Sequence, residues 1–247
     1  MDFSKMFENI IRLLTEYWHI YLLEGVKNTL ILTVIAVTMG TIFGALVAFL
    51  KMSRFKIVRF IASVYIEVIR GTPILLQLFV FYFILPELFP MLNFTDFIWV
   101  AIALCVNSAA YVSEVIRSGI QAVDKGQTEA ARSLGMSQSQ TMLRIILPQA
   151  VRNILPALGN EFIMILKETS LASTFFIGDL MTSHKIVAGA EYLQLESLTI
   201  VGTIYFCITF PLSKLVGWFE KKMANPNSYK KHNRKRAFMA GGKVSEQ

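Results

Sequence analysis

The sequence predicts an all-α protein that crosses a membrane several times. Hydrophobic residues make up 54% of the 247 residues and charged residues only 17%, and the mean hydropathy is +0.53. An ordinary soluble domain has about 45–50% apolar and about 25% charged residues. Apolar stretches long enough for a membrane-spanning helix, which needs about 20 residues, recur along the chain. The composition therefore excludes a disordered chain and a conventional soluble enzyme.

Residues 1–24 predict an amphipathic helix. Apolar side chains from Phe3 to Leu22 recur at helical spacing, and charged or polar side chains such as Asp2, Arg12 and Glu16 fill the other face. This pattern is typical of a helix that lies in the membrane interface, here the outer one. A secretory signal would have a basic start and a compact apolar core, which this segment lacks.

Five later stretches predict membrane spans. The four clear ones are residues 26–50, 57–85, 97–116 and 198–219. A fifth, residues 154–180, is weaker because Glu161, Lys167, Glu168 and Asp179 lie inside it. Five spans leave little of the chain for a soluble domain.

Basic residues predict the orientation. They gather in segments 51–59 and 117–152 and in the tail from residue 214, whereas segment 86–96 has none and 181–197 has only Lys185. Since cytoplasmic loops carry the excess of Lys and Arg, we expect the N-terminus outside and the C-terminus inside. The net charge of +7 is then mainly a topology signal. Residues 221–247 are expected to form a basic cytoplasmic tail near anionic lipid, and nucleic acid is not an expected partner.

No catalytic or metal-binding motif is present. The sequence has no G-x-x-x-x-G-K-[ST] phosphate loop, no G-x-S-x-G and no H-E-x-x-H. Cys105 and Cys207 lie in apolar stretches, and the three histidines are far apart. We therefore expect no catalytic residue, no metal and no bound cofactor. Energy for any active process would have to come from a partner or an ion gradient.

The segment 124–148 predicts two short helices joined by a turn. Residues 129–132 favour a helix, and Gly135 stands where a left-handed residue would end it. Ser137 can cap a second helix, and Pro148 ends that helix or kinks it into the next span. A compact loop between two spans is suited to docking, although it is also compatible with a simple surface loop.

This loop resembles the EAA loop of ATP-binding cassette (ABC) importer permeases. The matching positions are Glu129, Ala130, Ala131, Gly135, Ile145, Leu147 and Pro148. In that family the loop forms a coupling helix that sits in a cleft of the cytoplasmic ATPase subunit. The resemblance implies that these residues dock the ATPase, with the small side chains allowing close approach and Glu129 able to pair with a basic group.

Three further stretches are similar to the polar amino-acid branch of that family, whose members import histidine, glutamine, arginine, cystine or opines. They are residues 65–73, 107–111 and 159–162. The resemblance implies a type I importer transmembrane domain over residues 25–220 in a bacterial plasma membrane. It also implies ABC ATPase subunits that hold the ATP and Mg²⁺, an extracellular or periplasmic substrate-binding protein, a second permease subunit (identical or different) and an amino-acid substrate.

Polar residues inside the predicted spans need a reason, because a charge at the membrane centre costs about 2.5–3.5 kcal/mol. Glu67 and Arg70 are three residues apart and predict an ion pair beside the break at residues 71–73. The residues expected along a substrate path are Arg70, Asn107, Ser108 and Glu161. Glu161 could accept a substrate ammonium, or it could simply pair with Arg70 or Lys167. Asn107 and Ser108 could equally serve helix packing.

The leading functional hypothesis is thus the permease subunit of an ATP-driven amino-acid importer, which is not itself an enzyme. The alternative is a channel or a gradient-driven carrier without an ATPase partner. Such carriers usually contain inverted repeats, which five spans cannot supply in two matching halves. A docking loop would have no use in a channel, so the loop discriminates between the two hypotheses.

Overall fold

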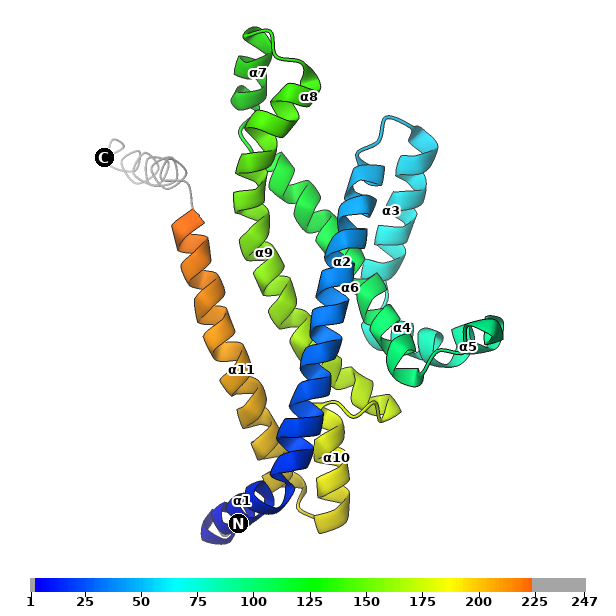
Figure 1. Cartoon of the computed structure of the whole chain (residues 1–247), viewed down its shortest axis with the longest axis vertical. Helices are drawn as coiled ribbons and strands as arrows, with labels where there is room; N and C mark the ends of the chain where they lie inside the picture. The colour runs from blue at the N-terminus through cyan, green and yellow to red at the C-terminus, as the bar shows by residue number, and fades with distance from the viewer. Residues whose placement is uncertain (1–2, 224–247) are drawn as a thin grey trace, which may run out of the picture.

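The computed structural model describes residues 3–223, and within that range the chain forms helices and no β-strand. The helices form an elongated bundle (Figure 1). Helices α7 and α8 lie at one end of the bundle, and α1 and α10 lie at the other. The predicted all-α fold is confirmed for the described residues.

The N-terminal helix runs directly into the first span. Helix α1 (Phe3–Trp18), a π-helical segment (His19–Val26) and α2 (Lys27–Lys51) form 49 residues of continuous helix. The predicted N-terminal helix is therefore present, but no loop separates it from the span. Leu13 and Tyr21 are fully buried in a cluster with α10 and α11, which holds α1 against that end of the bundle.

The second predicted span is broken. Helix α3 (Lys56–Gly71) ends at Thr72, which is extended with φ −119° and ψ 147°. Helix α4 (Ile74–Phe79) then leaves at a bend of 105° and continues through a π-helical segment (Val80–Ile84), α5 (Leu85–Leu88) and a 3-10 turn (Pro90–Leu92). The break predicted at residues 71–73 is confirmed, and the span predicted over residues 57–85 is bent there. Pro73 lacks a backbone N–H and pushes the residue before it out of the helical region, so the helix stops there.

The centre of the bundle is helix α6 (Asp96–Gln121), which packs closely on α2. A Cβ atom at Gly40 would lie 2.6 Å from Ser108 Oγ, and one at Gly44 would lie 2.8 Å from Val112 Cβ. These distances are shorter than side-chain packing allows, so glycine at both positions is what lets the two helices approach.

The last third of the chain contains three long helices. They are α9 (Leu147–Glu168), α10 (Leu180–Glu191) and α11 (Gln194–Met223), with a 3-10 segment (Thr169–Phe175) between the first two. The predicted fifth span, residues 154–180, therefore begins earlier and stops at Glu168. Residues 181–197, expected to be a loop, are largely helical.

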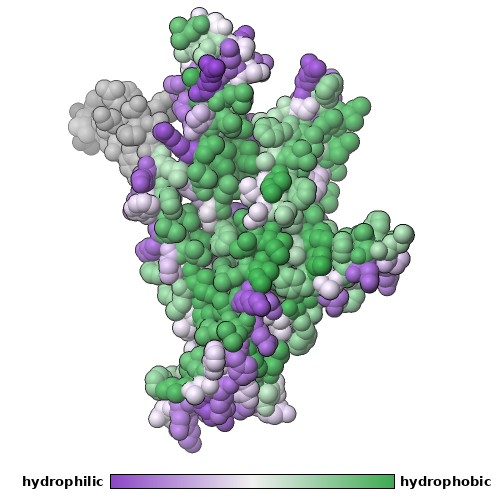
Figure 2. All heavy atoms as spheres, viewed as in Figure 1, coloured by the Kyte–Doolittle hydropathy of each residue, from purple (hydrophilic) through white to green (hydrophobic). Residues whose placement is uncertain are grey.

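Three helices are long and apolar enough to cross a membrane among the described residues, or four if the broken pair α3–α4 counts as one span. They are the 49-residue helix, α6 and α11. Helix α9 is not among them, and both polar and charged residues interrupt its apolar run. Figure 2 shows apolar side chains over the middle of the bundle and polar ones near both ends. Residues 221–223 close α11, and the rest of the predicted basic tail lies outside the described residues.

Candidate functional site

The loop between α6 and α9 forms a compact helical hairpin at one end of the bundle (Figure 1). Asp124 caps α7 (Lys125–Ser133) by accepting a hydrogen bond from the Gly126 N–H at 2.8 Å. Gly135 has φ +81°, and the N–H of Met136 donates to the Ala131 carbonyl at 3.1 Å. This is the left-handed end that the sequence predicts for the first helix.

The second helix of the loop, α8 (Gln138–Thr141), begins with a capping box. The Ser137 N–H donates to Gln140 Oε1 at 2.9 Å, and the Gln140 N–H donates to Ser137 Oγ at 3.2 Å. The predicted Ser137 cap is confirmed. A π-helical segment (Met142–Ile146) joins α8 to α9 without a loop. Pro148 therefore does not end the helix, and its missing N–H removes one backbone hydrogen bond from the continuous helical stretch.

The residues predicted to dock an ATPase gather at this end of the chain but differ in exposure. Glu129, Ala130, Gly135 and Pro148 are exposed, Ile145 and Leu147 are half-buried, and Ala131 is buried. Leu134, which the sequence analysis did not single out, is 84% exposed beside Gly135. A Cβ atom at Gly135 would meet no atom within 4 Å. The turn of the hairpin therefore presents small residues beside the exposed apolar side chain of Leu134, and Leu143 is a further exposed apolar residue in the same loop.

The break between α3 and α4 is held by Gln77, which the sequence analysis missed. Its side-chain amide donates to the carbonyls of Ile69 (2.7 Å) and Thr72 (3.2 Å) and to Thr72 Oγ1 (2.9 Å). Its own carbonyl accepts from Asn107 Nδ2 at 2.9 Å. Gln77 thus satisfies carbonyls that the proline break releases and ties them to α6. The available signal was a glutamine in an apolar stretch four residues after Pro73.

Ser108 and Glu161 form a buried polar pair of neighbours between α6 and α9. Ser108 is fully buried and Glu161 is 5% exposed. Among residues 3–223, neither Ser108 Oγ nor Glu161 Oε1 has a hydrogen-bond partner of normal geometry, although the Ser108 hydroxyl lies near the Glu161 carboxylate. Within residues 3–223 Glu161 makes no ion pair with Arg70 or Lys167, so that structural alternative is wrong. Buried polar atoms are normally hydrogen-bonded, so these two atoms call for an explanation.

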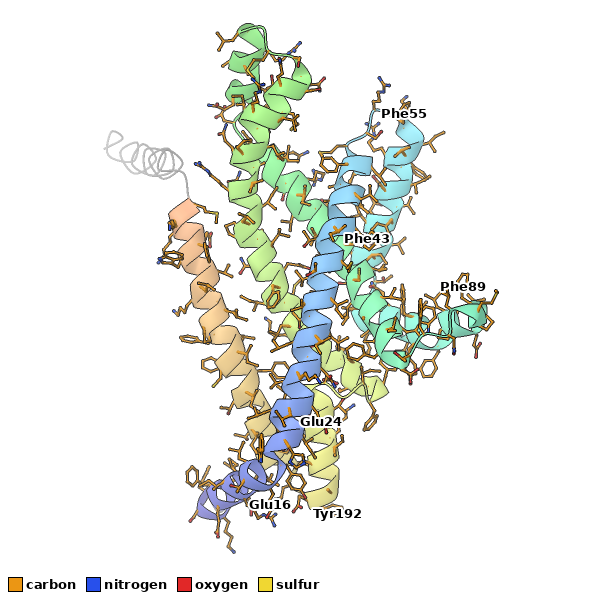
Figure 3. The ribbon with its side chains drawn as sticks, viewed as in Figure 1. Glu16, Glu24, Phe43, Phe55, Phe89 and Tyr192 are labelled. Atoms are coloured by element: carbon orange, nitrogen blue, oxygen red, sulfur yellow. The ribbon has the colours of Figure 1, made fainter. Side chains whose placement is uncertain are left out.

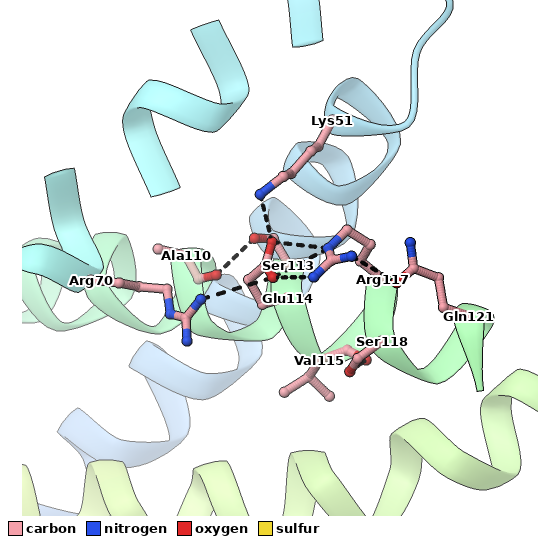
Figure 4. Close-up of polar contacts among 9 residues, drawn as sticks. All are labelled: Lys51, Arg70, Ala110, Ser113, Glu114, Val115, Arg117, Ser118 and Gln121. Atoms are coloured by element: carbon pink, nitrogen blue, oxygen red, sulfur yellow. Dashed lines mark hydrogen bonds and ion pairs between the residues drawn. The ribbon is translucent and has the colours of Figure 1, made fainter. Parts of the chain in front are cut away.

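Arg70 belongs to a charge cluster centred on Glu114 of α6 (Figure 4). Glu114 accepts hydrogen bonds from Lys51 Nζ at 2.8 Å and from Arg117 Nη2 at 2.7 Å, and Arg70 Nη1 lies 3.8 Å from Glu114 Oε2. Glu114 and Arg117 are three residues apart on α6, so this pair lies along one face of the helix. The Arg70 guanidinium also lies 5.3 Å from the centre of the Tyr111 ring. The cluster joins α2, α3 and α6 around one carboxylate.

The predicted Glu67–Arg70 ion pair is wrong. Glu67 is exposed and forms no ion pair or hydrogen bond with any of residues 3–223. Arg70 turns toward Glu114 and Tyr111 because α6 offers it both a carboxylate and a ring face. The same range also contains no group of three His, Cys, Asp or Glu side chains that could hold a metal ion.

Comparison with known proteins identifies the family. Residues 40–225 match the family described as "Binding-protein-dependent transport system inner membrane component". The chain belongs to this family. It is a multi-pass permease subunit of the bacterial plasma membrane, and in this family ATP hydrolysis is the task of a separate subunit.

Individual relatives agree with this assignment. The permease is 42% identical over 205 residues to the arginine transport system permease protein ArtQ of Bacillus subtilis, covering 82% of this chain and 92% of the relative. It is 41% identical over 203 residues to the nopaline transport system permease protein NocM of Agrobacterium fabrum, covering 79% and 84%.

Solved structures confirm the fold. A crystal structure of an amino acid ABC transporter with histidines matches with a TM-score of 0.80 and 46% identity, covering 85% of the permease and 96% of that chain. The MetNI methionine ABC transporter matches with a TM-score of 0.64 at 19% identity, which concerns the fold alone. The permease thus has the transmembrane fold of a type I ABC importer.

Proposed function

We propose that this permease forms the translocation path for a polar amino acid in an ATP-driven importer. The observation that carries the proposal is the buried Glu161 carboxylate, which lies near the buried Ser108 hydroxyl and has one oxygen without a hydrogen-bond partner among residues 3–223. An uncompensated carboxylate inside a membrane protein needs a cationic partner, and every amino-acid substrate carries an ammonium group. Relatives named for arginine, glutamine and nopaline transport support this substrate class.

The proposed path is lined by Arg70, Asn107, Ser108 and Glu161. In this arrangement Glu161 accepts the substrate ammonium, and Ser108 supplies a second oxygen. The Arg70 side chain is 44% exposed, and besides the Tyr111 ring it has only a 3.8 Å contact to Glu114, so its guanidinium can attract the substrate carboxylate. Asn107 acts through Gln77, whose hydrogen bonds fix the broken end of α3 beside the path.

The α7–α8 hairpin is the proposed ATPase-docking element. Its capped helices and its direct connection to α9 allow a displacement at the hairpin to reach Glu161, fourteen residues beyond Leu147 on the same helix. The permease binds no cofactor in this proposal, since ATP and Mg²⁺ belong to the ATPase. Alternating access then follows from two arrangements of rigid helices whose balance ATP shifts.

The proposed assembly has a defined orientation. The N-terminus lies outside, with α1 in the outer membrane interface, and the hairpin and the basic tail lie in the cytoplasm. An external substrate-binding protein delivers the amino acid, and a second permease subunit completes the path. The alternative of a channel or gradient-driven carrier is not supported, because the chain belongs to a binding-protein-dependent transport family.

The test is ATP hydrolysis by the permease reconstituted with its candidate ATPase, with and without a binding protein loaded with each polar amino acid. We expect stimulation by one loaded binding protein. A stable complex that no amino acid stimulates would contradict the substrate class. Correct membrane insertion without any ATPase complex would overturn the importer function in favour of a channel or carrier.

A further inference from the structure

The turn between α10 and α11 places a tyrosine where the backbone favours glycine. Helix α10 ends at Glu191, and the next residue, Tyr192, has φ 59° and ψ 21°. This left-handed position after a helix normally carries glycine, because a Cβ atom crowds the backbone there. The chain does place glycine at two other left-handed positions, Gly135 and Gly178, both with φ 81°. Tyr192 therefore stores backbone strain that glycine would avoid.

The Tyr192 side chain adds little to the fold in return. It is 89% exposed, and no hydrogen bond, ion pair or ring contact reaches it from residues 3–223. Phe176, another left-handed aromatic residue, differs because the Lys185 ammonium lies 5.4 Å from its ring centre. Strained residues that break a local rule without a contact in their own chain are typical of functional positions. The strain at Tyr192 therefore points to a partner outside this chain.

Polar contacts to α1 hold the turn in place. The Glu191 carboxylate accepts hydrogen bonds from Arg12 Nη2 at 2.9 Å and from the Tyr17 hydroxyl at 2.5 Å. On the other side of the turn, Asn9 Nδ2 donates to Glu196 Oε1 at 3.3 Å. The turn is thus fixed at both ends, and a side chain on a rigid turn loses little conformational entropy when it binds a partner.

The turn lies at the end of the bundle opposite the α7–α8 hairpin. Figure 3 shows Tyr192 at this end, together with Glu16 of α1. Glu16 and Glu24 are exposed, and no ion pair reaches either of them from residues 3–223. Arg12 does not neutralise them, because it already pairs with Glu191. This end of the bundle therefore combines an exposed aromatic side chain with unpaired negative charge.

We propose that Tyr192 is the anchor on which the external substrate-binding protein docks, and that it enters a pocket with a basic rim on that protein. The inference rests on the proposed function, because it uses the orientation proposed above. The family is binding-protein-dependent, and the ATPase is assigned to the opposite end of the bundle. Aromatic residues such as tyrosine carry much of the binding energy of protein interfaces. Glu16 and Glu24 attract the basic rim and accelerate association.

Replacement by glycine separates docking from folding. Tyr192→Gly removes the ring and suits the left-handed backbone, so we expect an unfolding temperature no lower than that of the wild type and normal co-purification with the ATPase. The probe is the loaded binding protein that stimulates ATP hydrolysis by the wild-type assembly. Its concentration for half-maximal stimulation should rise at least tenfold with Tyr192→Gly. Tyr192→Phe is the matched control, because it keeps both the ring and the strain, and it should stay within about threefold of the wild type.

Cross-linking tests the contact directly. The starting chain carries Cys105→Ser and Cys207→Ser, which remove both cysteines of the sequence. Tyr192→Cys in this chain is labelled with a thiol-reactive benzophenone and irradiated in the presence of the same binding protein. The control is Trp218→Cys, an exposed position near the other end of α11. We expect at least tenfold more cross-linked product from Tyr192→Cys than from the control.

The charged part of the surface is tested by the double variant Glu16→Gln with Glu24→Gln. Steering by unpaired charges acts on the rate of association and is screened by salt. We therefore expect the association rate of the binding protein to fall about threefold at low salt and the salt dependence of that rate to weaken.

Four results would overturn the inference. Unchanged half-maximal stimulation with Tyr192→Gly would remove the anchor. A lower unfolding temperature of Tyr192→Gly would show that the ring supports the fold. Equal cross-linking from Tyr192→Cys and Trp218→Cys would place the contact elsewhere, and unchanged association kinetics of the double variant would remove the charged part. A wild-type assembly that no loaded binding protein stimulates is the separate result that contradicts the proposed function.

Discussion

Asn107 of α6 donates its side-chain amide to the Gln77 carbonyl at 2.9 Å, and Gln77 donates in turn to the Ile69 carbonyl at 2.7 Å. The end of a broken helix is thereby fastened to the central helix of the bundle. This explains how a chain can turn by 105° inside an apolar bundle without leaving the carbonyl groups of the break unsatisfied.

Replacing Gln77 should therefore destabilise the fold more than its position in a short helix suggests. We expect Gln77→Leu to lower the free energy of unfolding by about 1–3 kcal/mol, since it leaves the Ile69 carbonyl and the Asn107 amide without partners. Thermal unfolding of the purified permease would show this loss of stability as a lower unfolding temperature. Gln138→Leu, at an exposed position, is the control. Equal unfolding temperatures for the two variants would show that Gln77 does not hold the break.

Substitution at Gly135 separates backbone strain from docking. Its φ of +81° disfavours L-residues, but asparagine tolerates that region, and the space around a Cβ atom is open. We expect Gly135→Asn to fold and insert normally yet to lose ATPase association at least tenfold, because its side chain occupies the docking surface. Gly135→Leu should add backbone strain of about 1–3 kcal/mol. Normal co-purification of the asparagine variant with the ATPase would contradict the docking assignment.

Glu161 should matter for transport rather than for folding. Glu161→Gln removes a charge but keeps the shape, so we expect assembly with the ATPase to persist while uptake of a cationic amino acid falls at least tenfold. Uptake in proteoliposomes and the unfolding temperature should be measured together. Glu8→Gln, on the exposed surface of α1, is the control. Unchanged uptake kinetics would remove Glu161 from the substrate path.

Substitutions in the Glu114 cluster should differ in how much they lower the free energy of unfolding. Glu114→Gln leaves Lys51, Arg70 and Arg117 together without an anion, and we expect a loss of about 1–3 kcal/mol in the free energy of unfolding. Lys51→Met should have a smaller effect, because Arg117 still pairs with Glu114. Thermal unfolding of both variants tests this order. A larger effect for Lys51→Met would mean that the carboxylate is not the centre of the cluster.

His184, at the end of the bundle formed by α1 and α10, should make the stability of the fold depend on pH. Burial lowers the pKa of His184 below its usual 6.5, and its Nδ1 lies 3.1 Å from Ser197 Oγ, which in turn contacts the Tyr21 hydroxyl at 2.7 Å. A lowered pKa means that the unfolded chain binds the proton more readily. The stabilisation is thus complete above pH 6.5 and is lost as the pH falls through the lowered value.

We therefore expect the unfolding temperature of the wild type to drop more between pH 7.5 and pH 5 than that of His184→Gln. His19→Gln, at an exposed histidine, should behave like the wild type. Identical pH profiles for the wild type and His184→Gln would show that His184 does not respond to pH in this range.

The local sequence was sufficient to predict several structural features of this protein. The helical class, the first, third and last spans and the caps of the α7–α8 hairpin depend on composition, on apolar stretches and on residues within five positions of one another. Gly135 and Ser137 act on neighbours in the chain, so their roles were readable from the sequence. Glu114 and Arg117 are three residues apart on one helix, so their ion pair could also be predicted from the sequence.

Other features depend on which helices meet, and the tertiary structure alone decided them. Glu67 and Arg70 have the spacing of an ion pair, but α6 offers Arg70 a carboxylate and an aromatic ring, so Glu67 has no ion-pair partner among residues 3–223. Gln77 can link the end of α3 to Asn107 because the chain bends at Pro73 and brings α4 against α6. The isolation of Glu161 could not be predicted either. Spacing shows which side chains can reach one another along a helix, whereas partners from distant segments are fixed by packing.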